Sequence, residues 1–271
     1  MPSTPVVASI ASVLTSIGAD AARHLDGVWR ELTRGQGAAE DEQFFRLVTG
    51  EPHPLGNMAI LRESTGAQTT ERAVAPLLAL TTPTAVLYPL GVSEAIAQSL
   101  IDRGYTRLGA MPAMAVEIDA MAPTTLPAGY EWVRIGSGAA GSEWADVVTD
   151  GFGLPRGLAR MLSPEVLEVD MAADARTQFF GIRRSGRLVA VSMLHLADGL
   201  AGIYCVATLP DERGRGLGAH VTAQALRAAH QVGYRVGILQ SSAAGHSVYL
   251  GLGFKDFGAV SMFVRTPVLT P

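Results

Sequence analysis

The stretch Ile203–Ala219, IYCVATLPDERGRGLGA, decides the fold, and the rest of the chain can be placed around it. It opens with the apolar and aromatic run Ile203–Val206, which predicts a buried strand. Pro210 ends that strand, because proline has no N–H to donate to a sheet ladder. A Gly/Arg turn follows, and a helical pattern runs from Ala219 to about His230. This order gathers backbone N–H groups at a helix N-terminus, where an anion such as a diphosphate is favoured.

Two motifs in this region match a known family. The turn Arg213-Gly214-Arg215-Gly216-Leu217-Gly218 resembles the acyl-CoA pyrophosphate loop, Arg-x-x-Gly-x-Gly, of the GNAT superfamily of N-acetyltransferases. Further on, Tyr249-Leu250-Gly251-Leu252-Gly253-Phe254 resembles the superfamily's Tyr-x-x-x-Gly-Phe signature. A Walker A loop is excluded, because no Gly-Lys-Ser/Thr run occurs at the required spacing. The resemblance implies a GNAT-like α/β fold with a mixed, antiparallel-rich sheet that binds acetyl-CoA as a cosubstrate.

The resemblance also implies roles for individual residues. The Val206 N–H matches the donor that faces the thioester oxygen, a contact that can contribute ~3 kcal/mol. Tyr249 occupies the general-acid position, where its phenol protonates the leaving thiolate. Ser242 stands where many relatives carry Asn, which leaves one contact with the cofactor open. The implied cofactor-binding residues are Val206, Thr208, Arg213, Gly214, Arg215, Gly216, Leu217, Gly218, Ser242 and Tyr249.

The residue that removes a proton from the amine cannot be assigned from the sequence. His195 shares a strand face with apolar neighbours, which favours a structural histidine. The carboxylates are more typical of solvated charges. The candidates by location are Glu165, Asp170, Asp174, His195 and His246.

Composition narrows the class of protein. The 271 residues suggest two domains, and a hydrophobic content of 48% indicates well-packed cores. A net charge of −4 without a basic run argues against nucleic acid as a partner. The single Cys205 fits a reducing, cytoplasmic setting and a core position, and no spacing of zinc ligands occurs. The apolar segment 6–19 lacks a basic flank and is too broken to span a membrane, so we expect a packed helix or arm.

A weak internal repeat indicates a tandem arrangement. Residues 103–114 and 252–262 both place Gly-aromatic, two polar residues, an apolar residue and Gly-Ala before an apolar strand. A helix that ends in an ordinary glycine C-cap followed by an aromatic residue would give a similar pattern, and this alternative stays open. We predict a degenerate GNAT-like domain at residues 1–120 without a CoA loop, a linker at 121–129, and a catalytic domain at 130–271.

Further elements follow from periodicity and turn residues. A Gly-x-Gly-x-x-Gly run at 136–141 does not predict a dinucleotide site, because no second strand and acidic residue follow about twenty positions on. We expect helices at 19–33, 70–80, 93–103, 143–149, 219–231 and 247–252, and one that opens at Ser163-Pro164. We expect strands at 44–48, 58–61, 84–90, 130–135, 177–182, 188–196, 236–240 and 261–265.

These observations predict an acetyl-CoA-dependent N-acetyltransferase that acts on a primary amine of a small or amino-acid-like molecule. The alternative is a non-catalytic protein of the same fold that binds or senses acyl-CoA. Longer acyl chains and protein substrates are further alternatives, and a homodimer is left open. No metal, nucleic-acid or membrane partner is expected.

Overall fold

The computed structural model describes residues 10–34, 37–62, 66–167 and 169–267. The first half, up to residue 120, begins with a long helix, and positions 6–9 of the predicted N-terminal arm lie outside the described residues. Its elements are α1 (Ile10–Leu32), β1 (Ala38–Glu40), β2 (Phe44–Val48), η1 (Pro54–Gly56), β3 (Asn57–Leu61), α2 (Ala67–Leu78), β4 (Thr84–Tyr88), α3 (Glu94–Ile101), β5 (Thr106–Arg107), β6 (Met111–Glu117) and η2 (Ile118–Ala120). Ser93 caps α3, because its side chain accepts from the Ile96 N–H.

The second half, from residue 130, follows the predicted order of elements. They are β7 (Tyr130–Ile135), α4 (Ala139–Phe152), α5 (Arg156–Met161), β8 (Thr177–Arg184), β9 (Arg187–Ala197), β10 (Leu200–Thr208), η3 (Pro210–Glu212), α6 (Leu217–Gln231), β11 (Val236–Gln240), α7 (His246–Leu252) and β12 (Lys255–Arg265). The hairpin turns at Ser185-Gly186 and Asp198-Gly199 have positive φ at both residues, which matches the right-handed twist of the paired strands.

Two helix predictions were wrong. Ser163-Pro164 opens no helix, because the helical turns come earlier, in α5, and the Ser163 hydroxyl accepts from the Glu165 N–H in a local turn. Helix α4 begins at Ala139, inside the glycine run, instead of at residue 143. The dinucleotide interpretation still fails, because β7 pairs with β8 in an antiparallel ladder and no parallel crossover follows.

The described strands form one mixed sheet. Its order is β1-β2-β3-β4-β12-β6-β11-β10-β9-β8-β7, and β5 pairs with β12 beside this path. In the first half β3 and β4 are parallel and joined through α2, and in the second half β10 and β11 are parallel and joined through α6. The two halves therefore repeat one topology, with α3 and α7 at corresponding places. The mixed, antiparallel-rich sheet was predicted correctly.

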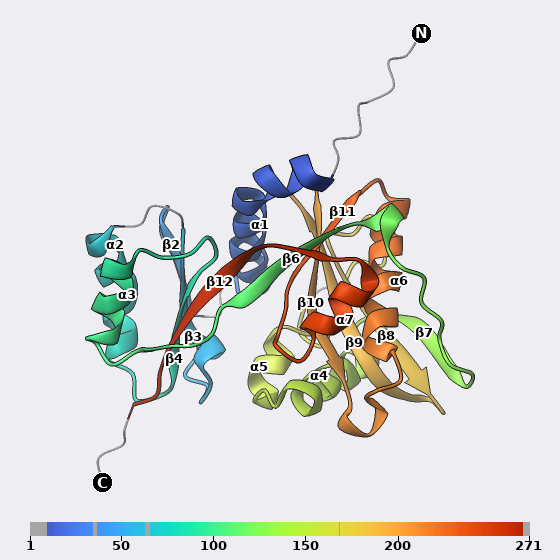
Figure 1. The fold of residues 1–271 in the computed structure, drawn as a ribbon. Helices are drawn as coiled ribbons and strands as arrows, with labels where there is room; N and C mark the ends of the chain where they lie inside the picture. Colours follow the sequence, from blue (N-terminus) through green and yellow to red (C-terminus); the bar gives the residue numbers. More distant parts are fainter. Residues whose placement is uncertain (1–9, 35–36, 63–65, 168, 268–271) are drawn as a thin grey trace.

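The halves exchange their last strands (Figure 1). Strand β6 pairs with β11 of the second half, and β12 pairs with β4 and β5 of the first half. β6 and β12 also pair with each other, from Lys255 opposite Ala115 to Val260 opposite Met111. The last strand therefore begins at Lys255, six residues earlier than predicted. The hydrogen bonding does not follow a division at residues 121–129, and that division stays a prediction.

Helix α1 joins the two halves into one core (Figure 1). Its Leu25, Val28 and Leu32 lie in a hydrophobic cluster that contains side chains of β2, β3 and β4 as well as the second-half core. Ile17 and Ala21 pack on β6, β10 and β11. Among the described helices, none has the length and apolar content needed to cross a bilayer.

Two buried histidines lie where α1 meets the second half. His24 of α1 is fully buried, and its ring contacts the His195 ring edge to face at 5.2 Å. His195 Nδ1 lies 2.9 Å from the Thr177 hydroxyl. Burial lowers the pKa of His24, and burial together with His24 and Arg176 lowers the pKa of His195 to about 3. Both imidazoles are therefore neutral at pH 7.

Acid should destabilise the protein through these two groups before its carboxylates titrate. A histidine with a lowered folded pKa contributes stability that is present above the unfolded pKa of about 6.5 and is lost as pH falls below it. From pH 7 to pH 5, His195 alone should cost about 2 kcal/mol of unfolding free energy. Urea unfolding at several pH values measures this loss, and the double variant His24→Gln, His195→Gln is the control. If the unfolding free energy depends on pH equally in the wild type and in the double variant, the lowered pKa assigned to the buried histidines is contradicted.

Candidate functional site

Strand β10 is irregular at the point where the site is built. Its ladder with β9 shifts register between Tyr204 and Ala207, and Cys205 adopts φ +50°. With β11 it pairs only over Leu200–Gly202. β10 and β11 therefore diverge beyond Gly202, which leaves β10 backbone groups next to Val206 without a partner strand on that side.

The Gly/Arg turn connects this strand to a helix with an uncapped N-terminus. Gly214 and Gly216 both have φ +75°, a conformation that glycine adopts without strain. Gly216 is the N-cap of α6, and no side chain caps the helix. The first amides of α6 are therefore available to an anion, and the helix dipole adds to the attraction.

The predicted cofactor residues converge on one cavity of about 600 Å³. Val206, Ala207 and Thr208 of β10 form one wall, and the turn and the start of α6 form another. Gly151 and Phe152 of α4 and the segment before α7 close it. Nine of the ten predicted residues line this cavity: Val206, Thr208, Arg213, Gly214, Gly216, Leu217, Gly218, Ser242 and Tyr249. Arg215 is not among its lining residues.

The two arginines of the turn have partners within the protein. The Arg213 guanidinium donates to the Gly151 carbonyl at 2.8 Å and to the Thr208 carbonyl at 3.3 Å, so it ties the turn to α4 and β10. Arg215 pairs with Glu212 at 3.2 Å. The side chains thus hold the loop in shape, and Gly214, Gly216 and Gly218 of the turn line the cavity.

Glu212 lines the cavity, and the sequence analysis did not identify it. Its side chain is 7% exposed and accepts from the Tyr130 hydroxyl at 2.5 Å and from Arg184 at 2.9 Å. These hydrogen bonds hold the pKa of the Glu212 carboxyl below its usual range. A charged Glu212 links the turn to β7 and β8, strands that lie far away in sequence and give no local signal.

Tyr249 lies in the cavity wall as a neutral phenol. Burial raises its pKa to about 12. The neighbouring Thr222 Oγ1 is buried and has no hydrogen-bond partner in the described structure, Tyr249 included. Ser242 Oγ accepts from the Gly245 N–H at 3.2 Å and thereby shapes the turn before α7.

Burial also raises the pKa of the Cys205 thiol to about 12, so this thiol is not a thiolate at pH 7.

None of the five candidate bases lines the cavity. Glu165 pairs with Arg156 and Arg160, and His246 with Asp256 at 3.0 Å. Burial and the Thr177 contact give His195 a structural role. Asp170 Oδ1 accepts from the Ala172 N–H. Asp174 is exposed and is not among the lining residues either.

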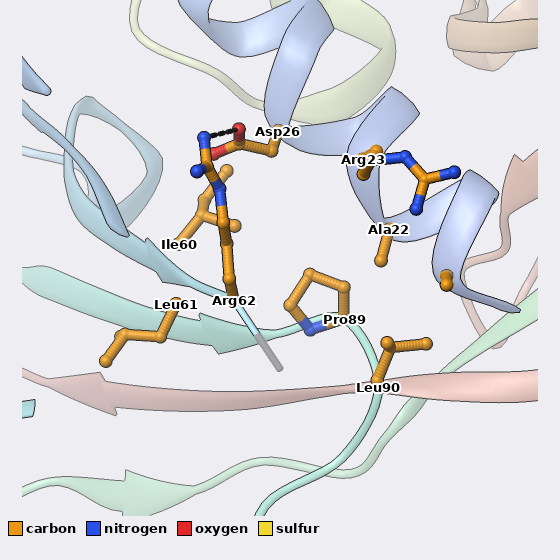
Figure 2. A pocket seen from close by; sticks show the side chains of 9 residues that line it. Ala22, Arg23, Asp26, Ile60, Leu61, Arg62, Pro89 and Leu90 are labelled. Atoms are coloured by element: carbon orange, nitrogen blue, oxygen red, sulfur yellow. Dashed lines mark hydrogen bonds and ion pairs between the residues drawn. The ribbon is translucent and has the colours of Figure 1, made fainter. Parts of the chain in front are cut away.

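A second cavity, of about 170 Å³, lies between α1 and the first-half sheet (Figure 2). Its walls are mostly aliphatic, with Asp26 of α1 paired to Arg62 at one end. None of the predicted site residues lines it. It is therefore separate from the cavity of the Gly/Arg turn.

Comparisons with known proteins bear on this site. The sequence profile of the Acetyltransferase (GNAT) family matches residues 152–254, which include β10, the Gly/Arg turn, α6 and α7. Residues 152–254 are a GNAT acetyltransferase domain. No curated protein matches the chain in sequence.

Solved structures share the fold across both halves of the chain. A GCN5-related N-acetyltransferase from Kribbella flavida is 19% identical, with a TM-score of 0.66 over 92% of this chain and 95% of that one. One from Sphaerobacter thermophilus is 16% identical, with a TM-score of 0.58 over 93% and 91%. A tandem GNAT protein from the clavulanic acid biosynthesis pathway is 15% identical, with a TM-score of 0.52 over 97% and 96%. These likenesses confirm the GNAT fold and the tandem arrangement.

The unpartnered hydroxyl of Thr222 gives a prediction about stability. Replacing a buried hydroxyl that lacks a partner by a methyl group of the same shape removes an uncompensated desolvation cost. Thr222→Val should therefore raise the unfolding free energy by about 1 kcal/mol, as measured by urea unfolding. Thr70→Val is the matched control and should be destabilising, because its buried hydroxyl lies 3.0 Å from the Tyr88 hydroxyl. A destabilised Thr222→Val protein would mean that Thr222 does bond to Tyr249.

Proposed function

We propose that the protein transfers an acetyl group from acetyl-CoA to a primary amine of a small or amino-acid-like molecule. The main support is that nine of the ten residues implied by the GNAT resemblance line one cavity. The cavity also suits the ligand, because uncapped helix amides and two left-handed glycines lie at one end and an unpaired strand edge lies along its wall.

Different residues of the chain would bind different parts of the cosubstrate. The amides from Gly214 to Gly218 would hold the diphosphate, because the Arg213 N–H already donates to the Pro210 carbonyl, and Gly216 and Gly218 allow close approach of its oxygens. The open edge of β10 at Val206 and Thr208 would pair with the amide-containing arm. When bound, acetyl-CoA supplies an activated acyl group as a thioester.

Two groups would then serve the transfer itself. The Val206 N–H would donate to the thioester oxygen and stabilise the negative charge that develops there as the amine attacks, a contribution of ~3 kcal/mol. Tyr249 would give its proton to the sulfur as the C–S bond breaks. Burial raises its pKa to about 12, which keeps the phenol protonated at neutral pH and also makes it a weaker acid than a free tyrosine.

The alternative is a protein that binds acyl-CoA without acetylating an amine. One observation favours it: the five carboxylates and histidines that were candidate bases all lie away from the cavity lining. Binding and turnover must therefore be measured separately.

Gly218→Glu tests the cavity as the binding site. A Cβ at Gly218 meets only Thr208 and Val206, at 3.8 and 3.9 Å, so the new side chain extends into the cavity without backbone strain. Its charge suits a helix N-terminus, and the variant should fold. By calorimetry we expect micromolar acetyl-CoA binding in the wild type and a loss of at least about tenfold in Gly218→Glu, or about 1.4 kcal/mol.

Gly109→Glu is the matched control for this experiment. Gly109 is exposed, has open space around it and lies in the first half, so its variant should bind as the wild type does. Equal binding by Gly218→Glu would contradict the site, and no binding by the wild type would contradict the proposed function. Thiol release across a panel of primary amines then separates the enzyme, in which Tyr249→Phe should lower kcat by roughly a hundredfold, from a protein that only binds.

A further inference from the structure

We infer that His24, on the helix contributed by the first half, positions the thioester-binding backbone of the second half by holding the Tyr204 hydroxyl. His24 would be a positioning residue that acts through Tyr204 on Cys205 and Val206. This inference rests on the proposed function, because it gives a role to the Val206 N–H.

The backbone at this point needs support from its surroundings. Cys205 has φ +50°, and such a conformation costs a residue with a side chain on the order of 1–2 kcal/mol. It also lies in the register shift between Tyr204 and Ala207, after which β10 pairs with β9 again. A strained residue of this kind keeps its conformation only when the residues before and after it are fixed.

The residues after the bulge are fixed by α4. A Cβ on Gly151 would lie 2.8 Å from Ala207 Cβ and 3.4 Å from the Thr208 nitrogen, so the end of α4 packs directly on β10. Arg213 adds hydrogen bonds from the turn to the Gly151 and Thr208 carbonyls.

The residues before the bulge are fixed by His24. Its Nδ1 lies 2.8 Å from the Tyr204 hydroxyl, and its Nε2 lies 3.1 Å from the His195 carbonyl on β9. The His24 and Tyr204 rings are stacked at 5.9 Å. A Cβ on Gly202 would lie 2.3 Å from His24 Cε1, so the imidazole sits against the β10 backbone itself. His24 thus contacts both strands just before the bulge, at His195 on β9 and at Gly202 and Tyr204 on β10.

These contacts determine the tautomer of His24. The His195 carbonyl can only accept, so Nε2 carries the proton, and Nδ1 accepts from the Tyr204 O–H. Burial lowers the pKa of His24 and keeps this neutral form at pH 7. The Tyr204 side chain therefore has a single acceptor that fixes its direction, one residue before Cys205.

The other side of α1 is anchored in the first half. Asp26 Oδ2 accepts from Arg62 of the β3 edge at 2.9 Å and from Arg30 at 2.7 Å, as the close-up in Figure 2 illustrates for Arg62. Arg30 also donates to the Phe44 carbonyl of β2 at 3.0 Å. The helix that carries His24 is thus held by the first-half sheet, and this gives the degenerate half a function in the site of the other half.

The test measures how strongly the bound thioester carbonyl is polarised, and it needs no acceptor amine. The probe is acetyl-CoA labelled with ¹³C at the acetyl carbonyl, together with unlabelled CoA for comparison of affinity. The variants are Tyr204→Phe, which removes one hydroxyl, His24→Leu, which keeps the volume without hydrogen bonds, and His24→Gln, which can restore both hydrogen bonds. Tyr105→Phe is the control, because it removes a buried hydroxyl bonded to Thr84 in the first half.

We expect the carbonyl resonance to move downfield on binding to the wild type, to Tyr105→Phe and to His24→Gln. Tyr204→Phe and His24→Leu should lose at least about half of this shift, and their preference for acetyl-CoA over CoA should fall roughly threefold to tenfold. Affinity for CoA itself should stay the same, because the Gly/Arg turn is intact.

Two results would overturn the inference, and they are distinguishable. If the wild type binds acetyl-CoA and both Tyr204→Phe and His24→Leu keep the full shift, His24 does not position Val206, and the proposed function stands. If the wild type does not bind acetyl-CoA, the proposed function fails and the inference fails with it. Should His24→Leu unfold, Tyr204→Phe alone decides.

Discussion

The pairing of β6 with β11 is the interaction on which the rest of the structure depends. All five residues of β11 pair with β6, from Val236 opposite Glu117 to Gln240 opposite Ala113, whereas β10 pairs with β11 over only three rungs. A strand of the first half therefore holds β11 in place while β10 bends away at Cys205. Without that pairing β11 would expose an open edge and could follow β10, and the opening beside Val206 would close.

The exchange of strands also gives the first half, which has no Arg-x-x-Gly-x-Gly run, a structural part in the second half. β12 completes the first-half sheet, β6 completes the second, and α1 fills the space between them with one continuous core. The first half supplies strand β6, helix α1 and the buried His24, while the Gly/Arg turn and Tyr249 come from the second half. The residues proposed to bind and to react thus come from the second half, and residues of both halves hold them in place.

The sequence predicted the local features well, because glycine, proline and short hydrophobic patterns act over a few residues. The Gly/Arg turn depends on neighbours in the chain, and the structure has it between strand β10 and helix α6 as expected. The elements that the sequence predicted incorrectly depend on tertiary contacts. Gly141 lies in α4 because its missing Cβ leaves room for the Pro164-Glu165 backbone, 2.6 Å from where that atom would be. Glu212 and His24 have partners up to 180 residues away, which no local pattern reveals.

The central claim is that Val206 and the start of α6 form one acetyl-CoA site in the second half. Backbone amide NMR during titration with acetyl-CoA and then with CoA tests it most directly. The account predicts that the Gly216 and Gly218 amides move with both ligands, and that the Val206 amide moves downfield, as a new hydrogen bond requires, only with acetyl-CoA. Shifts confined to the start of α2 in the first half, or a Val206 amide that responds equally to both ligands, would contradict it.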